Sequence, residues 1–163
     1  MRTLAITAAV IFLLDQISKV VVVHWLNLSE LGSIDVIPPY LNFRMAWNRG
    51  VNFGLFAGDA DTTRWILIAV ALAISAWVVW WLHRENEGTL GLISGGLLVG
   101  GALGNVVDRV LYGAVADFLN MSCCGIENPW SFNVADIAIF AGAIGLIAFT
   151  GRDKGRDAPR KPR

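Results

Sequence analysis

The chain has 163 residues, of which 55% are hydrophobic and only 16% are charged. A soluble domain of this length carries about 25% charged residues. Here the apolar residues form long runs, so the composition excludes an ordinary soluble domain and indicates a membrane protein. The formal net charge is zero.

The first apolar segment, residues 3–23, has the length of a membrane-spanning helix. Asp15 and Lys19 interrupt it and no small-x-small cleavage site follows, so we interpret it as a retained span and not as a cleaved signal peptide. The two charged residues are four positions apart, on one face of a helix, where they can pair. A buried pair that fixes how the first helix docks is the preferred interpretation, and support of a nearby site or proton handling is the alternative.

Residues 24–64 form a connection that is too long for a simple loop. Within it, apolar side chains recur at every second position, which predicts a strand with one apolar face. These side chains are Leu41, Phe43, Met45 and Trp47, and residues 48–50 then provide turn chemistry. We expect a small sheet on the membrane, its apolar face towards lipid or a lipid-linked substrate, although interfacial anchoring explains the aromatic residues equally well.

Three further apolar segments predict three more spans, at residues 65–82, 89–107 and 134–150. The middle segment is rich in glycine, and glycines spaced by four let another helix approach closely. Examples are Gly96, Gly100 and Gly104. We interpret them as helix packing without a catalytic role. The expected fold class is an all-α membrane protein with four transmembrane helices and a small β-sheet subdomain on the outer side, which would be the periplasmic side in a bacterial inner membrane.

The charges of the connections predict domain organisation and orientation. Residues 1–151 are expected to form a single transmembrane domain, and residues 152–163 a disordered basic tail. Six of the 13 basic residues lie in that tail, and a short basic segment beside a span is an orientation signal and not a nucleic-acid site. Together with Arg2 and Arg84, the tail favours cytoplasmic termini, which places the connections after the first and third spans outside.

Polar residues gather where the third and fourth spans meet the outer surface. If the third helix continues beyond residue 107, four polar side chains share one face, namely Asn105, Asp108, Arg109 and Tyr112. Asp117 follows closely, and Asp136 lies just inside the fourth span, with Asn133 three positions before it. Because the two spans form a hairpin, both aspartates belong to the same edge of the membrane.

Two carboxyl groups that share one proton form a hydrolytic pair, because the charged one accepts a proton from water and the neutral one donates to the substrate carbonyl. Asp117 and Asp136 are the candidates for this role, which requires neither metal nor cofactor. The sequence contains no HExxH, P-loop or GxSxG motif. Two alternatives remain open: a Ser–Lys dyad of Lys19 with Ser122 or Ser131, and a small proton-coupled transporter, which would place its carboxylate near the midplane.

Three motifs follow one another along the second half of the chain, GNVVDR at 104–109, GAVADF at 113–118 and FNVAD at 132–136. In this order and spacing they resemble the bacterial lipoprotein signal peptidase (signal peptidase II) family. Five further positions match the pattern of that family: Asp15, Lys19, Asn48, Gly50 and Phe53. The resemblance covers essentially the whole chain.

The resemblance implies an aspartic endopeptidase of the bacterial inner membrane. Its substrates would be prolipoproteins whose lipobox cysteine already carries diacylglycerol, and it would cut just before that cysteine. Carried over by motif, Asp117 and Asp136 would be the catalytic pair, with Asp15 and Lys19 as structural support. The residues that would shape the site or bind substrate are Asn48, Gly50, Asn105, Asp108, Arg109 and Asn133. We expect no cofactor, no metal and no nucleic acid, and a monomer whose partners are its substrates and membrane lipids.

Overall fold

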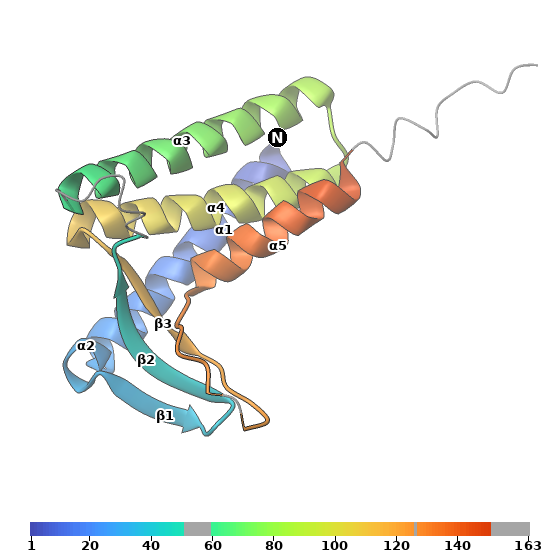
Figure 1. Cartoon of the computed structure of the whole chain (residues 1–163). Helices are drawn as coiled ribbons and strands as arrows, with labels where there is room; N and C mark the ends of the chain where they lie inside the picture. The colour runs from blue at the N-terminus through green and yellow to red at the C-terminus, as the bar shows by residue number, and fades with distance from the viewer. Residues whose placement is uncertain (51–59, 126, 151–163) are drawn as a thin grey trace, which may run out of the picture.

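The computed structural model describes residues 1–50, 60–125 and 127–150. Figure 1 shows a bundle of long helices with a small sheet beyond one end of it. The expected basic tail, residues 152–163, and Phe53 of the family pattern lie outside the described residues. In chain order the elements are α1 (Arg2–Lys19), the π-helical turn η1 (Val20–Trp25), α2 (Leu28–Leu31), β1 (Ser33–Ile37), β2 (Leu41–Asn48), α3 (Ala60–Glu85), α4 (Thr89–Tyr112), β3 (Val115–Asn120) and α5 (Val134–Phe149).

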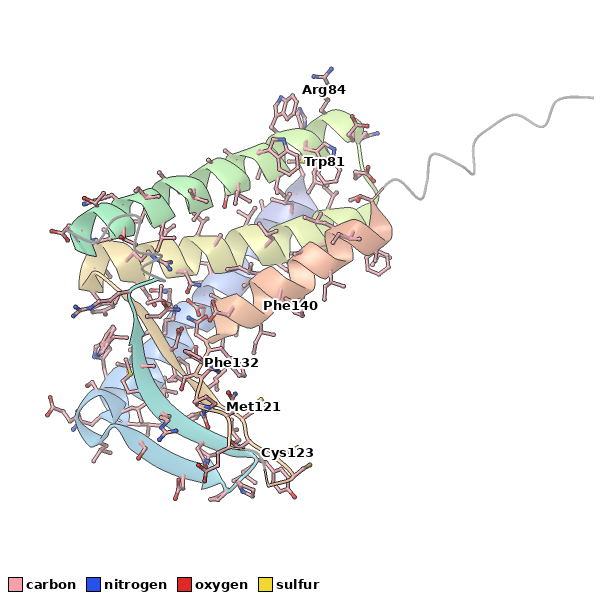
Figure 2. The ribbon with its side chains drawn as sticks, in the orientation of Figure 1. Trp81, Arg84, Met121, Cys123, Phe132 and Phe140 are labelled. Atoms are coloured by element: carbon pink, nitrogen blue, oxygen red, sulfur yellow. The ribbon has the colours of Figure 1, made fainter. Side chains whose placement is uncertain are left out.

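In the part of the chain that the structure describes, three helices are long and apolar enough to cross a membrane: Arg2–Trp25, which is α1 with η1, Asp61–Glu85 and Thr89–Tyr112. The fourth, α5, has 16 residues and is about 24 Å long at 1.5 Å per residue. Large apolar side chains point outward from the bundle, as Phe140 does in Figure 2. The exposed fraction of the Phe140 side chain is 70%. An apolar exterior is compatible with lipid as the solvent. The predicted class, a helical membrane protein with a small sheet, is confirmed.

Helix α4 packs against α1, α3 and α5, and its glycines permit the close contacts. A Cβ added at Gly100 would lie 2.5 Å from the carbonyl oxygen of Ala8 in α1. A Cβ added at Gly101 would lie 2.5 Å from the carbonyl oxygen of Ala135 in α5. Two helix backbones therefore approach α4 directly, which lipid-embedded helices need because hydrophobic burial does not drive their association. The prediction of glycine-mediated packing is confirmed.

Helix α4 extends beyond its apolar segment, to Tyr112. It ends where Gly113 adopts a left-handed φ of 76°, and the Gly113 N–H donates to the carbonyl oxygen of Arg109 (3.1 Å). The additional turn keeps Asp108 and Arg109 on the same helix as Asn105, as the one-face prediction requires.

The sheet is antiparallel, in the order β1-β2-β3. The strand predicted from the alternation at 41–47 is β2. The sequence does not predict β3, because this strand is buried over most of its length and so lacks an alternation of polar and apolar residues. Ala46 of β2 pairs with Asp117 of β3, so the sheet itself fixes the position of one candidate catalytic residue.

The apolar face of the sheet is largely covered by protein, and the expectation that it faces lipid or substrate is wrong for Phe43 and Met45. Both side chains pack against a buried cluster in which η1 and α2 meet β3; its members are Val22, Val23, Leu28, Ala116 and Phe118. The rings of Phe43 and Phe118 meet edge to face, with 5.9 Å between their centroids. This packing joins the sheet firmly to the end of the first span.

Candidate active site

Asp117 lies in the middle of β3 and is buried, with 3% of its surface exposed. Its carboxylate accepts a hydrogen bond from Asn133 Nδ2 at Oδ1 (2.7 Å) and one from Asn48 Nδ2 at Oδ2 (3.1 Å). Asn48 is the last residue of β2, so the strand pairing brings this amide to the carboxylate. The Asn48 side chain is itself oriented by the Gly50 N–H, which donates to Asn48 Oδ1 (2.9 Å). This bond is the predicted turn chemistry.

Gly50 lies next to the site and has a φ of 90°, which favours glycine. A Cβ at this position would also lie 2.6 Å from Cδ1 of Leu67 in α3. Gly50 therefore permits the turn that presents Asn48, and its hydrogen bond to Asn48 links it to the site.

Asp136 lies in the first turn of α5, where it forms a capping box with Asn133. The Asp136 N–H donates to Asn133 Oδ1 (2.8 Å), and the Asn133 N–H donates to Asp136 Oδ2 (3.3 Å). The other carboxylate oxygen, Oδ1, accepts a hydrogen bond from Asn105 Nδ2 (2.9 Å). The capping box therefore both begins helix α5 and orients the Asp136 side chain.

One amide group, the side chain of Asn133, contacts both aspartates. It is fully buried; its Nδ2 donates to Asp117, while its Oδ1 accepts from the backbone of Asp136. Asn105 adds a second link, because its Oδ1 accepts from Asn133 Nδ2 (3.2 Å) and its Nδ2 donates to Asp136. The structure thus brings together Asp117 and Asp136, which the hairpin argument predicts.

The pKa of Asp117 is raised from its ordinary value of 3.8 to about 7. Burial is the largest cause, and the negative charge of Asp136 adds to it, while Asn48, Lys19 and Asn133 act in the opposite direction. A carboxyl group with this pKa is about half protonated at neutral pH. It can therefore serve as an acid under conditions where an ordinary aspartate is ionised.

Arg109 is placed beside the pair by the last turn of α4. Its Nη1 donates to the carbonyl oxygen of Asn105 (3.3 Å), and its guanidinium is within electrostatic reach of Asp136 and Asp117. The hydrogen bond that Arg109 makes is with the backbone and not with a carboxylate. The guanidinium therefore acts on the aspartates through its charge.

Asp15, Lys19 and Asp108 form a buried ion network below the pair. Lys19 Nζ lies 2.7 Å from Asp15 Oδ2 and 2.7 Å from Asp108 Oδ2. The predicted pairing of Asp15 with Lys19 is confirmed. Gln16 also joins the network, because its Nε2 donates to Asp15 Oδ2 (3.1 Å) and to Asp108 Oδ1 (3.2 Å). Gln16 is not predicted as a site residue from the sequence, although a polar residue beside Asp15 in an apolar span is a signal.

A family model described as Signal peptidase (SPase) II matches residues 7–151. The chain belongs to the signal peptidase II family. The lipoprotein signal peptidase of Methylobacterium sp. (strain 4-46) is 40% identical to it over 160 residues, which cover 96% of this chain and 93% of the relative. That of Methylorubrum extorquens (strain PA1) is 45% identical over 129 residues, with coverages of 77% and 70%.

Solved structures agree with this assignment. Two structures described as a bacterial membrane enzyme are similar, one at 27% identity with a TM-score of 0.78, covering 94% of this chain and 95% of the other. The second has 26% identity and a TM-score of 0.75, covering 100% and 96%. As a signal peptidase II, the chain is a bacterial membrane peptidase of the family that cleaves the signal peptides of prolipoproteins.

The Ser–Lys alternative does not fit the contacts in this signal peptidase II. Lys19 Nζ is held by Asp15 and Asp108, whereas Ser131 Oγ donates to the carbonyl oxygen of Arg44 (2.9 Å) and Ser122 Oγ accepts from the Asn128 N–H (3.0 Å). A transporter would place its carboxylate at mid-depth, but Asp136 lies in the first turn of its helix. Across residues 1–50, 60–125 and 127–150, no cluster of three or more metal-ligating side chains is present.

A polar cavity of about 270 Å³ lies away from the aspartates, and neither of them lines it. Asn42, Arg44 and Asn120 contribute to its wall. Asn42 pairs with Asn120 in the sheet, several positions from the pair of Ala46 with Asp117. We therefore place the candidate active site at the junction of β3 and α5, and not in this cavity.

Proposed function

We propose that this signal peptidase II is an aspartic endopeptidase that cuts prolipoproteins just before the diacylglyceryl-modified cysteine, with Asp117 and Asp136 as its catalytic pair. The observation that carries this proposal is the single buried amide of Asn133, which contacts Asp117 and Asp136 together. Side chains from four elements or their ends, Asn48, Asn105, Asp117 and Asp136, join in one hydrogen-bonded group.

The proposed chemistry assigns different tasks to the two carboxyl groups. Asp117, with its raised pKa, holds the shared proton and donates it to the scissile carbonyl oxygen. Asp136 accepts a proton from a water molecule, whose oxygen then bonds to the carbonyl carbon. In the second step Asp136 returns its proton to the departing amine nitrogen as the peptide bond breaks, and Asp117 recovers its proton from the intermediate hydroxyl.

Neighbouring groups keep this pair in working geometry. Asn48 and Asn133 hold the two oxygens of Asp117, and Asn105 holds Asp136. The positive charge of Arg109 offsets negative charge at the pair. Because each amide donor is supplied by a separate element, the arrangement is fixed by the fold before substrate arrives, which is how such sites lower barriers.

The position of the site suits a lipid-modified substrate. Asp136 begins a helix of the bundle, while Asp117 lies in the sheet beyond it (Figure 1). Acyl chains can therefore remain in the bilayer while the scissile bond reaches water. The N-terminus, the α3–α4 turn and the end of α5 lie at the opposite end of the bundle (Figure 1). We propose an inner-membrane monomer with cytoplasmic termini and the active site at the periplasmic face.

The test uses purified enzyme in detergent and two prolipoproteins that differ only in the diacylglyceryl group on the lipobox cysteine. We expect the modified substrate to yield a product that begins with the modified cysteine, as mass spectrometry will show. The unmodified substrate should be cut at least about 100-fold more slowly, because binding energy from the acyl chains contributes to catalysis. Equal rates on both substrates, or a product that begins at another residue, would contradict the proposal.

A further inference from the structure

The residue that precedes each aspartate is held in place by a buried carboxylate. The N–H of Ala116, which precedes Asp117, donates to Asp108 Oδ2 (3.1 Å). The N–H of Ala135, which precedes Asp136, donates to Asp15 Oδ1 (3.0 Å). These two carboxylates come from different helices, α4 and α1, so each catalytic segment is attached to a separate part of the bundle.

One cation joins the two attachments. Lys19 Nζ lies 2.7 Å from Asp15 Oδ2 and 2.7 Å from Asp108 Oδ2, and it donates to Asn105 Oδ1 (3.3 Å). Asn105 in turn donates to Asp136. Lys19, Asp15 and Asp108 are each at most 5% exposed. The lysine is therefore almost completely enclosed by protein, and its polar contacts are with these neighbours.

We infer that Lys19 is a positioning residue that couples the Asp117 and Asp136 segments by bridging the two carboxylates which hold Ala116 and Ala135. The inference rests on the proposed function. It goes beyond structural support, because it states that Lys19 controls the distance between the two reacting carboxyl groups. Each aspartate follows directly after a residue whose N–H is hydrogen-bonded to one of these carboxylates. Movement of either carboxylate therefore moves a catalytic group. A misplacement of about 1 Å can cost about 100-fold in rate.

The charge of Lys19 has a second effect that a merely structural residue would lack. Asp117 faces the negative charge of Asp136 and the donors Asn48 and Asn133, and the positive charge of Lys19 favours its ionised form. Arg109 faces the same group from α4. Loss of the lysine charge therefore raises the pKa of Asp117 above its present value.

The experiment compares Lys19→Met, Lys19→Arg and a matched control, Ser18→Ala, in the full-length enzyme. Ser18 is the neighbouring residue, and its Oγ donates only to the Asp15 carbonyl oxygen (2.7 Å). We expect Lys19→Met to lower kcat about 100-fold with little change in KM, and Ser18→Ala to match the wild type. In Lys19→Met, the loss of activity at high pH that reports Asp117 should move to higher pH. Lys19→Arg keeps the charge, so its pH profile should stay in place while its kcat falls.

Lys19→Met leaves the buried carboxylates of Asp15 and Asp108 without the positive charge that pairs with them, so this variant can fail to fold. The double variant Lys19→Met/Asp15→Asn removes one of them and keeps an oxygen for the Ala135 N–H. It should show the same fall in kcat with a smaller pH shift, because the lost Asp15 charge offsets part of the lost lysine charge. A folded variant with kcat within twofold of wild type, or with lowered kcat and an unmoved pH profile, would overturn the inference. Because wild-type cleavage and the aspartate variants are measured separately, failure of the proposed function would be recognised independently.

Discussion

Asp117→Asn and Asp136→Asn are each expected to abolish cleavage of a diacylglyceryl prolipoprotein. An asparagine at position 117 could not supply the proton for the scissile carbonyl, and one at position 136 could not accept a proton from water, so each variant loses one half of the acid–base pair. We expect a fall of at least about 1,000-fold in kcat/KM for either change. Product formation by purified enzyme in detergent, followed by mass spectrometry, measures it.

Matched controls separate this result from the serine alternative. Ser131→Ala removes only a hydrogen bond to the Arg44 carbonyl oxygen, and Ser122→Ala one from the Asn128 N–H. Both variants, and wild type treated with a metal chelator, should cleave within about twofold of the untreated enzyme. Near-normal turnover by either aspartate variant, or strong dependence on one of the serines, would remove the aspartate pair as the catalytic unit.

The same Asp117→Asn variant should reveal the raised pKa of Asp117 through the pH dependence of the free energy of unfolding. The folded-state pKa of about 7 lies above the ordinary value of 3.8, so wild type loses stability as pH rises between these values, while the variant has no such group. About three pKa units correspond to at most about 4 kcal/mol. The new amide mismatches one of the two donors at this position, which costs about 1–3 kcal/mol at every pH.

Thermal unfolding in detergent at pH 4 and pH 8 measures this effect. The quantity compared is the free energy of unfolding of Asp117→Asn minus that of wild type. This difference should increase by on the order of a few kcal/mol from pH 4 to pH 8. A pH-independent difference between the two proteins would mean that Asp117 has an ordinary pKa. Retained folding at pH 8 would also show that the loss of cleavage in this variant is a loss of chemistry.

The second large effect is expected at Gly100, where α1 crosses α4. An added methyl group would lie 2.5 Å from the Ala8 carbonyl oxygen and 2.9 Å from Ala8 Cα, so the backbone of α1 must move away. Overpacking of this kind costs about 1–3 kcal/mol or more. Because α1 carries Asp15 and Lys19, Gly100→Ala should lower both the unfolding temperature and kcat.

Gly91 of the same helix provides the matched control. A Cβ there would lie 3.4 Å from Glu87 Cβ and 3.5 Å from Thr150 Cγ2, which are tolerable contacts. Replacing a helical glycine by alanine stabilises by about 0.5–1 kcal/mol when space allows. Gly91→Ala should therefore be as stable as wild type or slightly more stable, and fully active. Equal stability of Gly100→Ala and Gly91→Ala would contradict the glycine-mediated contact between α1 and α4.

Local patterns in the sequence predict several of these features well. Apolar runs locate the long helices, and alternation locates β2. The convergence of Asp117 with Asp136 follows from the hairpin of two spans, because such a hairpin brings its outer ends to one depth. The spacing of Asp15 and Lys19 predicts their ion pair, since residues four apart share a helix face.

Long-range contacts are what the sequence cannot provide. Lys19 binds Asp108 as closely as it binds Asp15, but only the nearby partner can be inferred from spacing. The strand β3 is buried on both faces and therefore lacks the alternation that reveals β2. The cover over Phe43 and Met45 depends on how η1 and α2 fold back on the sheet. These features arise when separate elements pack together, which one-dimensional periodicity does not record.

The proposed mechanism requires that the two carboxyl groups share one proton, and infrared titration can detect this proton. A difference spectrum between wild type and Asp117→Asn isolates the carboxyl band of this residue. We predict a protonated carboxyl signal at about pH 5 that disappears with a midpoint near the pKa of about 7, and that changes when Asp136 is replaced by asparagine. If the Asp117 carboxyl group is already fully ionised at about pH 5, the two aspartates do not share a proton near neutral pH.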